Sequence, residues 1–236
     1  MIVLPRKQCD RGVRWRAPIG LVLGAGVALS ALAGATGTSA ASPSPLSGLS
    51  TALNSASSYQ VDLTITGASS GKITGTVVVL RHNGKNRAHL VLNAPAGSGA
   101  MTSLDAVVAG SRVCVKQSPS MPYRCVTSPA VAAQINLDPS NTFQRPGVST
   151  TFTPAGSKVV LGKLCTGYTF TLTAKGAQAH GTLYVNPTNG RPREEDVVTT
   201  GATTGATTTG KTTTLKTLAI WSRYDDPTLT IPIVPA

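Results

Sequence analysis

The chain has 236 residues and a formal net charge of +12, from 21 Lys and Arg against 9 Asp and Glu. Only 4% of its residues are aromatic, and the basic residues are spread along its length. It therefore lacks both the stacking platforms of single-strand binders and the concentrated basic face of duplex binders. We expect no nucleic-acid partner, and a diffuse positive charge suits an anionic membrane or cell-wall surface better.

Residues 1–40 have the pattern of a secretory signal peptide. A basic segment ending at Arg16 is followed by an uncharged apolar run over residues 17–35, and then by small residues up to Ala40 and Ala41. Cleavage is expected after one of these two alanines. The alternative is an uncleaved N-terminal anchor, since the run approaches the roughly 20 residues that span a bilayer. Both readings place the rest of the chain outside the cytoplasm.

The elements expected after the signal begin with one short helix and continue as strands. Residues 46–57 place leucines at helical spacing, and residues 59–66 alternate strictly between apolar and polar side chains. Alternation predicts a strand with one dry and one wet face. The apolar residues are Tyr59, Val61, Leu63 and Ile65; the polar ones are Gln60, Asp62, Thr64 and Thr66.

Further hairpins are predicted along the chain. Residues 72–95 turn at Asn83-Gly84, and residues 104–116 turn at Gly110-Ser111. A second helix is predicted over residues 128–137, where Ser128 is a cap and Pro129 stands at the first helical position. Strand-like segments then follow at 157–175, 179–194 and 211–227. Because period two dominates and no αβ alternation is visible, the fold class is α+β, mostly antiparallel β.

Three cysteines lie beyond the signal: Cys114, Cys125 and Cys165. Val113 and Val115 bracket Cys114, Val126 follows Cys125, and two prolines lie between the cysteines, which predicts two strands joined by a loop. In an oxidising compartment we expect a disulfide between them. A metal site is the weaker alternative, because the spacing is not C-x₂-C and no histidine is near, so none is expected. Cys165 is left as a free buried thiol, an alternative partner or an intermolecular link.

Residues 205–212 read GATTTGKT and match the P-loop pattern G-x-x-x-x-G-K-[ST]. A P-loop needs a buried strand before it and a helix immediately after its lysine. Here the preceding segment is charged and rich in Thr and Gly, and the following one is strand-like. We therefore predict a hairpin loop that binds no nucleotide.

Catalytic patterns are equally weak. GASSG at residues 67–71 matches the nucleophile elbow G-x-S-x-G, but a strand-like segment follows it where the elbow needs a helix. His82 and His89 are expected to be solvated beside a hairpin turn, and the acidic run 194–196 to be an exposed strand end. We expect no enzyme activity and no cofactor.

The order of these features resembles the LolA-like superfamily. The likeness rests on the signal, the short helix, SSYQVDLTITG at 57–67, G-x-x-C-x-G-Y-x-F-x-L at 162–172 and LYVNPTNGRPRE at 183–194. The ending WSRYDDPTLTIPIVP is similar to the last strand of its actinobacterial LppX/LprG-type branch. This chain lacks the cysteine that the lipoprotein branch carries at the signal boundary, which favours a soluble or wall-associated form.

The resemblance implies a curved half-barrel sheet with one or two short helices on its concave side. It divides the chain into residues 1–40 as the signal peptide or anchor, 41–58 as a linker and first helix, and 59–236 as a single antiparallel half-barrel domain. In such proteins the concave apolar face holds the acyl chains of lipids or lipoproteins.

The residues alone point the same way, because a long sheet with one apolar face must cover that face or fill it. Medium-sized aliphatic side chains suit an apolar cavity for flexible chains. We therefore expect an extracytoplasmic carrier of a lipid or acylated molecule. The alternatives are an envelope protein-binding or sensing module of the same fold, and a domain whose core is fully closed. The predicted cavity residues are Val61, Leu63, Ile65, Val77, Val79, Leu90 and Leu92.

Overall fold

The structure is a computed structural model, and it describes most of the chain after residue 45. The described residues are 46–67, 71–82, 85–95, 103–116, 118–129, 132, 143, 148–174, 177–202 and 212–234. The predicted signal peptide or anchor therefore lies outside the described residues, as do residues 41–45 of the predicted linker.

The bounds of one helix and eleven strands are defined within the described residues. In order they are α3 (Leu46–Asn54), β1 (Ser58–Gly67), β2 (Gly71–His82), β3 (Lys85–Asn93), β4 (Ser103–Ala109), β5 (Arg112–Lys116), β6 (Arg124–Thr127), β7 (Ser149–Val160), β8 (Lys163–Ala174), β9 (Ala177–Val185), β10 (Pro192–Ala202) and β11 (Thr212–Ser222).

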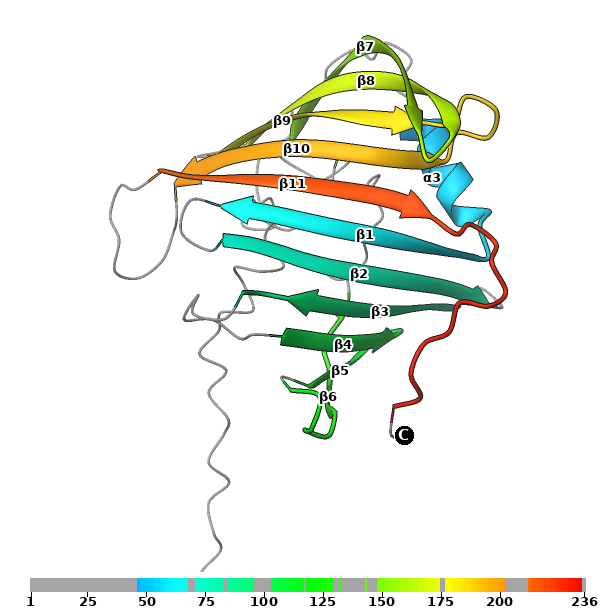
Figure 1. Cartoon of the computed structure of the whole chain (residues 1–236), viewed down its shortest axis with the longest axis vertical. Helices are drawn as coiled ribbons and strands as arrows, with labels where there is room; N and C mark the ends of the chain where they lie inside the picture. The colour runs from blue at the N-terminus through cyan, green and yellow to red at the C-terminus, as the bar shows by residue number, and fades with distance from the viewer. Residues whose placement is uncertain are drawn as a thin grey trace, which may run out of the picture.

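The strands form a single open, curved antiparallel sheet in the order β6-β5-β4-β3-β2-β1-β11-β10-β9-β8-β7 (Figure 1). Two runs of sequential hairpins, β1 to β6 and β7 to β11, are joined side by side through the pairing of β1 with β11. The prediction of a mostly antiparallel sheet is confirmed, and the strands nearest the two ends of the chain meet in its middle.

The turns predicted from glycine and asparagine are also confirmed. His82 pairs with Lys85 across the Asn83-Gly84 turn, and Gly110 has a φ of 60° between β4 and β5. Residues 67–71 join β1 to β2, so the G-x-S-x-G match lies in a hairpin.

The P-loop match also joins two paired strands. Residues 203–211, which include most of the match, lie outside the described residues. They connect β10 to β11, whose ends pair through Ala202 and Thr212. A strand therefore begins at Thr212, where a nucleotide-binding P-loop needs a helix.

Side chains alternate along the strands, so the sheet has two faces. The inner face carries the apolar residues of β1 and their cross-strand partners, and the opposite face is the outer face. The inner face carries most of one buried cluster, to which α3 contributes Leu49 and Leu53. A Cβ placed on Gly190, in the β9–β10 turn, would lie 3.5 Å from Cβ of Ala52. The helix is thereby packed against this turn at one end of the strands.

The second predicted helix, at residues 128–137, falls mostly outside the described residues. Pro129 and Ala132 are helical, and the amide of Ala132 donates a hydrogen bond to the carbonyl of Ser128 at 3.0 Å. Ala132 and Phe143 are buried in the same cluster as the inner face. The ring of Phe143 packs edge-on against Phe170, with centroids 4.9 Å apart.

The disulfide prediction is confirmed. Cys114 and Cys125 lie directly opposite each other on β5 and β6 and are bonded. Cys165 is a free, fully buried thiol on β8, and burial raises its pKa. A thiol in this state is a poor nucleophile, so Cys165 behaves as a packing residue.

Candidate functional site

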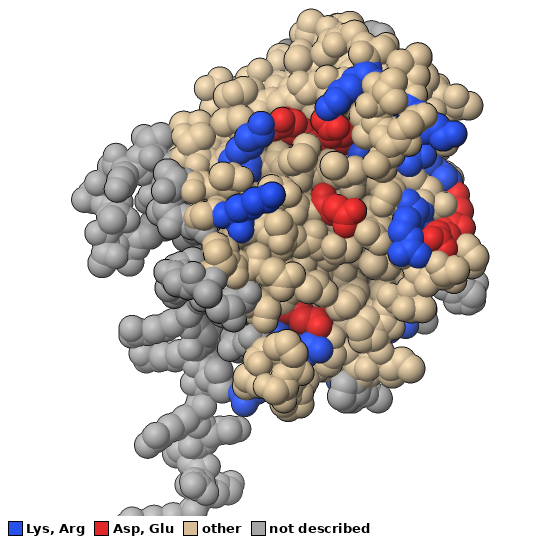
Figure 2. Space-filling model, in the orientation of Figure 1, with Lys and Arg blue, Asp and Glu red and all other residues tan. Residues whose placement is uncertain are grey.

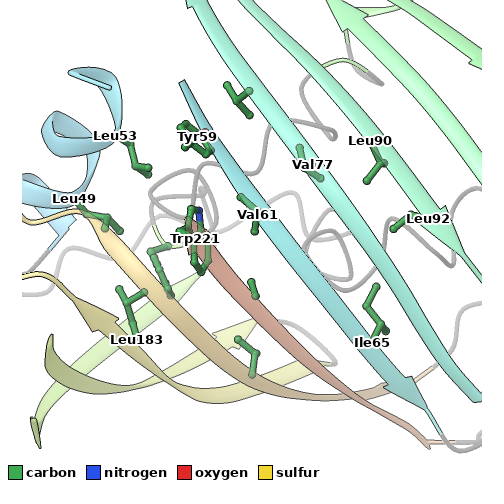
Figure 3. Packing of buried hydrophobic residues seen from close by; sticks show 14 of the residues in the cluster. Leu49, Leu53, Tyr59, Val61, Ile65, Val77, Leu90, Leu92, Leu183 and Trp221 are labelled. Carbon is green, nitrogen blue, oxygen red and sulfur yellow. The ribbon is translucent and has the colours of Figure 1, made fainter. Parts of the chain in front are cut away.

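All seven predicted cavity residues lie on the inner face. Val61 stands between Val77 and Trp221, and Leu63 stands between Gly75 and Ala219. These pairs form two rows across the sheet. Val77 pairs in turn with Leu90 in the first row, and Gly75 pairs with Leu92 in the second. Figure 3 shows five of the seven, Val61, Ile65, Val77, Leu90 and Leu92, on one side of the sheet, with Ile65 at the end away from α3. Their role in ligand binding stays a prediction.

Burial separates Leu63 from the other six residues. Val61 and Val77 are fully buried, and Ile65, Val79, Leu90 and Leu92 are at most 6% exposed, whereas Leu63 is only partly buried. A side chain added at Gly75 would collide with Leu92, so Leu92 fills the space that the glycine leaves.

The inner face extends onto β8 to β11, which the sequence interpretation did not include in the site. Trp221, Leu183, Ala179, Phe170 and Leu172 are all buried there. The signal for β8 was visible, because Tyr168, Phe170 and Leu172 alternate with threonines. The pairing of β1 with β11, which places Trp221 beside Val61, has no local sequence signal.

The prediction that the acidic run 194–196 is an exposed strand end was wrong. Glu194 is 9% exposed and pairs with Lys158 at 2.7 Å, and Asp196 pairs with Lys216 at 3.1 Å. Both are on the outer face, where Lys and Arg lie interspersed with Asp and Glu (Figure 2). Because side chains alternate along a strand, the residue between them, Glu195, points to the inner face.

Glu195 lies in the same cross-strand row of the inner face as Leu63, and this row is called the central row below. It pairs with Ala219 of β11 on one side and with Leu183 of β9 on the other, and Ala219 pairs with Leu63. Its carboxyl group has no hydrogen bond or ion pair with any residue that the structure describes. Burial raises its pKa from 4.5 to about 7. The group can thus be a neutral hydrogen-bond donor or an anion within the physiological range of pH.

The end of the inner face nearest α3 is polar and aromatic. The rings of Tyr59 and Tyr224 are 5.9 Å apart, and the guanidinium of Arg81 lies 5.6 Å from the centroid of Tyr59. Arg193 stands 5.1 Å from the ring of Tyr224, whose hydroxyl donates a hydrogen bond to the carbonyl of Pro192 at 2.6 Å. These cation–π contacts and the tilted pair of tyrosine rings brace the end of the sheet.

A second polar cluster lies on the outer face around Asp105. Its carboxylate accepts hydrogen bonds from Tyr123 at 2.7 Å and His89 at 2.9 Å, and pairs with Lys116 at 3.1 Å. Burial opposes ionisation of Asp105, but these three partners outweigh it and hold its pKa below the ordinary value. The prediction that His89 is solvated was wrong, because its side chain is only 17% exposed and tied to Asp105.

The Asp105 cluster has the geometry of a structural clamp. All its partners converge on one carboxylate and connect β3, β4, β5 and the segment before β6. No nucleophilic side chain hydrogen-bonds to His89 within the described residues, so the arrangement lacks the nucleophile of a hydrolytic triad.

No group of three or more His, Cys, Asp or Glu among the described residues could hold a metal ion. No helix among them is long and apolar enough to cross a membrane.

Comparison with known proteins finds resemblance only at the level of fold. No family model matches the chain, and no curated protein sequence matches it. Similar solved structures include MucB in complex with MucA(peri), at 15% identity and a TM-score of 0.41. The match covers 81% of this chain but only 56% of the MucB chain.

Two other solved structures are similar to this chain, and one of them is named as a LolA superfamily protein. A LolA superfamily protein from Nitrosomonas europaea matches at 13% identity and a TM-score of 0.27, over 77% of this chain and 92% of that one. A putative outer membrane lipoprotein-sorting protein domain from Vibrio parahaemolyticus matches at 8% identity and a TM-score of 0.33, over 78% and 93%. At these values the similarity assigns neither a family nor a function to the chain.

Proposed function

We propose that the chain is an extracytoplasmic carrier that holds the acyl chains of a lipid or lipoprotein against the inner face of its sheet. The observation that carries the proposal is the packing of the central row. Leu63 and Glu195 remain partly accessible there, while Val61 and Ile65 in the rows on either side are at most 6% exposed. Leu63 and Glu195 stand on either side of the buried Ala219, so two accessible side chains lie close together in this row.

The helix α3 is too short to cover this face by itself. Its nine residues span about 14 Å at 1.5 Å per residue, whereas eleven strands span about 48 Å at their usual spacing. Leu49 and Leu53 point from α3 toward Tyr59 and Trp221, at one end of the face (Figure 3). In a half-barrel of the LppX/LprG type, α3 would close that end on the concave side and leave the centre to a ligand.

The chemistry of the face suits an acyl chain. Binding would remove apolar surface from water, which stabilises a complex by about 25 cal/mol per Å² without requiring directional contacts. The disulfide between Cys114 and Cys125 supports an oxidising, extracytoplasmic location. We propose no enzyme activity and no cofactor for this face.

For exchange with a membrane, the β7–β8 hairpin offers a contact. Val159, Leu161 and Leu164 are 64%, 57% and 63% exposed at its tip, and Lys163 is exposed beside them. Apolar side chains beside a cation fit an anionic lipid surface, which attracts the charge and accepts the apolar groups. We include this hairpin in the proposed function as the surface that docks on the membrane.

Displacement of a fluorescent fatty-acid probe tests the carrier function. Leu63→Gln should weaken uptake because it places an amide in the accessible centre, whereas Thr64→Gln, one residue along on the outer face, should bind as wild type does. Thermal melts of both variants separate loss of binding from loss of fold. A wild-type chain that takes up no probe, or a Leu63→Gln variant that binds normally, would refute the carrier and favour the protein-binding alternative.

A further inference from the structure

Glu195 stands out among the acidic residues of the sheet. The described strands contain four other Asp or Glu residues, and all of them are on the outer face. Three of those, Asp105, Glu194 and Asp196, form ion pairs with lysines. Glu195 has no such partner and is surrounded in its row by Ala219 and Leu183. A carboxyl group in this position destabilises the fold unless another group uses it.

The surroundings of Glu195 offer no titratable partner in the described part of the chain. Tyr168 follows Leu183 across the sheet, on β8, and Arg193 is two residues earlier on β10. Farther along the inner face lie Tyr59 on β1 and Arg81 on β2. Arg193 lies over the ring of Tyr224, and Arg81 lies over the ring of Tyr59. None of these groups hydrogen-bonds to Glu195 or forms an ion pair with it.

Glu195 is partly accessible on the inner face, although burial raises its pKa to about 7. Leu63, which is partly buried, stands in the same row on the far side of Ala219. The carboxyl group is therefore within reach of a ligand that lies along this row.

We propose that Glu195 is the recognition group of the inner face, and that its carboxyl group donates a hydrogen bond to an ester or amide oxygen of the acylated ligand. This inference rests on the proposed carrier function. It specifies the ligand as a molecule whose acyl linkage, and not only its hydrocarbon, lies against the centre of the sheet.

The chemistry of both groups supports this pairing. A carboxyl group in apolar surroundings is more stable in its neutral form, which has one O–H donor. An ester or amide oxygen is an uncharged acceptor, so the pair can be buried without leaving a net charge. A hydrocarbon without this oxygen would leave the donor unpaired, which makes Glu195 selective for acylated molecules over alkanes.

Binding should therefore depend on pH. With a pKa of about 7, Glu195 is almost entirely neutral at pH 5.5 and almost entirely ionised at pH 8.5. If only the neutral form binds, the apparent Kd for an ester rises by about 30-fold between these two pH values. Loss of one neutral hydrogen bond corresponds to about a 2- to 10-fold loss of affinity.

The experiment compares a pyrene-labelled fatty acyl methyl ester with a pyrene-labelled alkane of equal length, at pH 5.5 and pH 8.5. Wild type should prefer the ester at pH 5.5 and bind it up to about 30-fold more weakly at pH 8.5. Glu195→Gln keeps an N–H donor and should bind the ester equally at both pH values. Glu195→Leu should lose the preference for the ester by about 2- to 10-fold and still bind the alkane.

Matched controls are Asp196→Asn and Asp196→Leu, which make the same changes on the outer face of the same strand. They should bind as wild type does, and thermal melts should show that every variant is folded. An ester preference in Glu195→Leu equal to that of wild type, or a pH dependence that persists in Glu195→Gln, would overturn the role of Glu195 and leave the carrier intact. If wild type binds neither probe at either pH, the carrier function and this inference are both overturned.

Discussion

The position of Glu195 makes a prediction about stability that requires no ligand. Its pKa is about 7 in the folded chain and close to 4.5 when the chain is unfolded. Below about pH 4.5 both states are protonated, so the group has no effect on the free energy of unfolding. Between pH 4.5 and 7 the unfolded state releases the proton first, and the stability of the fold falls as pH rises. Above pH 7 the loss is complete.

The size of the effect on the free energy of unfolding follows from the shift in the pKa of Glu195. Each pKa unit corresponds to about 1.4 kcal/mol, so a shift from 4.5 to about 7 lowers the free energy of unfolding by about 3 kcal/mol above pH 7. Glu195→Gln removes the ionisable group and keeps the shape, so it should raise stability by up to about 3 kcal/mol at pH 8. For a domain of this size that equals about 6 to 12 °C in Tm.

The assay is urea unfolding of wild type and Glu195→Gln at pH 4 and pH 8. The difference between the two chains should be near zero at pH 4 and approach its full value at pH 8, because effects of other carboxylates cancel in the comparison. Asp196→Asn is the control, and removing its ion pair with Lys216 should change stability by at most about 1 kcal/mol. If Glu195→Gln is no more stable than wild type at pH 8, the pKa of Glu195 is not raised in the folded chain, and the reasoning is wrong.

Three further predictions concern other parts of the chain. Replacing Cys114 and Cys125 by serine should lower the free energy of unfolding by about 3 kcal/mol through the loss of a short closed loop, and urea unfolding that matches wild type would contradict this. Lys211→Ala should leave stability and probe binding unchanged, and magnesium-dependent ATP binding that disappears in this variant would restore the P-loop interpretation. Replacing Leu161 and Leu164 by serine should weaken sedimentation with anionic vesicles without affecting probe binding; equal sedimentation would exclude the hairpin as the docking surface.

The parts of the fold that could be predicted from the sequence are those with local signals. Alternation in residues 59–66 fixes which side chains of β1 share a face, and glycine turns fix where a strand reverses. The cysteines could be paired because they flank one short loop. Each of these predictions depends on residues close together in the chain.

The pairing of β1 with β11 could not be predicted in the same way. Val61 and Trp221 are 160 positions apart in the chain (221 − 61), and no turn chemistry connects them. Without this pairing, half of the inner face was missing from the predicted site. The acidic run 194–196 was misinterpreted for a related reason, since three charged residues in a row suggest solvent, whereas a strand must turn the middle one to the opposite face.

Stability and binding are linked through Glu195 if it recognises the ligand as proposed. At pH 8 the empty chain has an ionised carboxylate on an apolar face, which weakens the fold by about 3 kcal/mol. A ligand that accepts a hydrogen bond from the neutral form raises the pKa of Glu195 further and binds a proton with it. By reciprocity, a fall in pH strengthens ligand binding as much as the ligand strengthens proton binding. A glutamine at this position would give a more stable protein that holds its ligand equally well at every pH. As pH rises, ionisation of the carboxyl group therefore lowers the stability of the empty chain and also promotes release of the ligand.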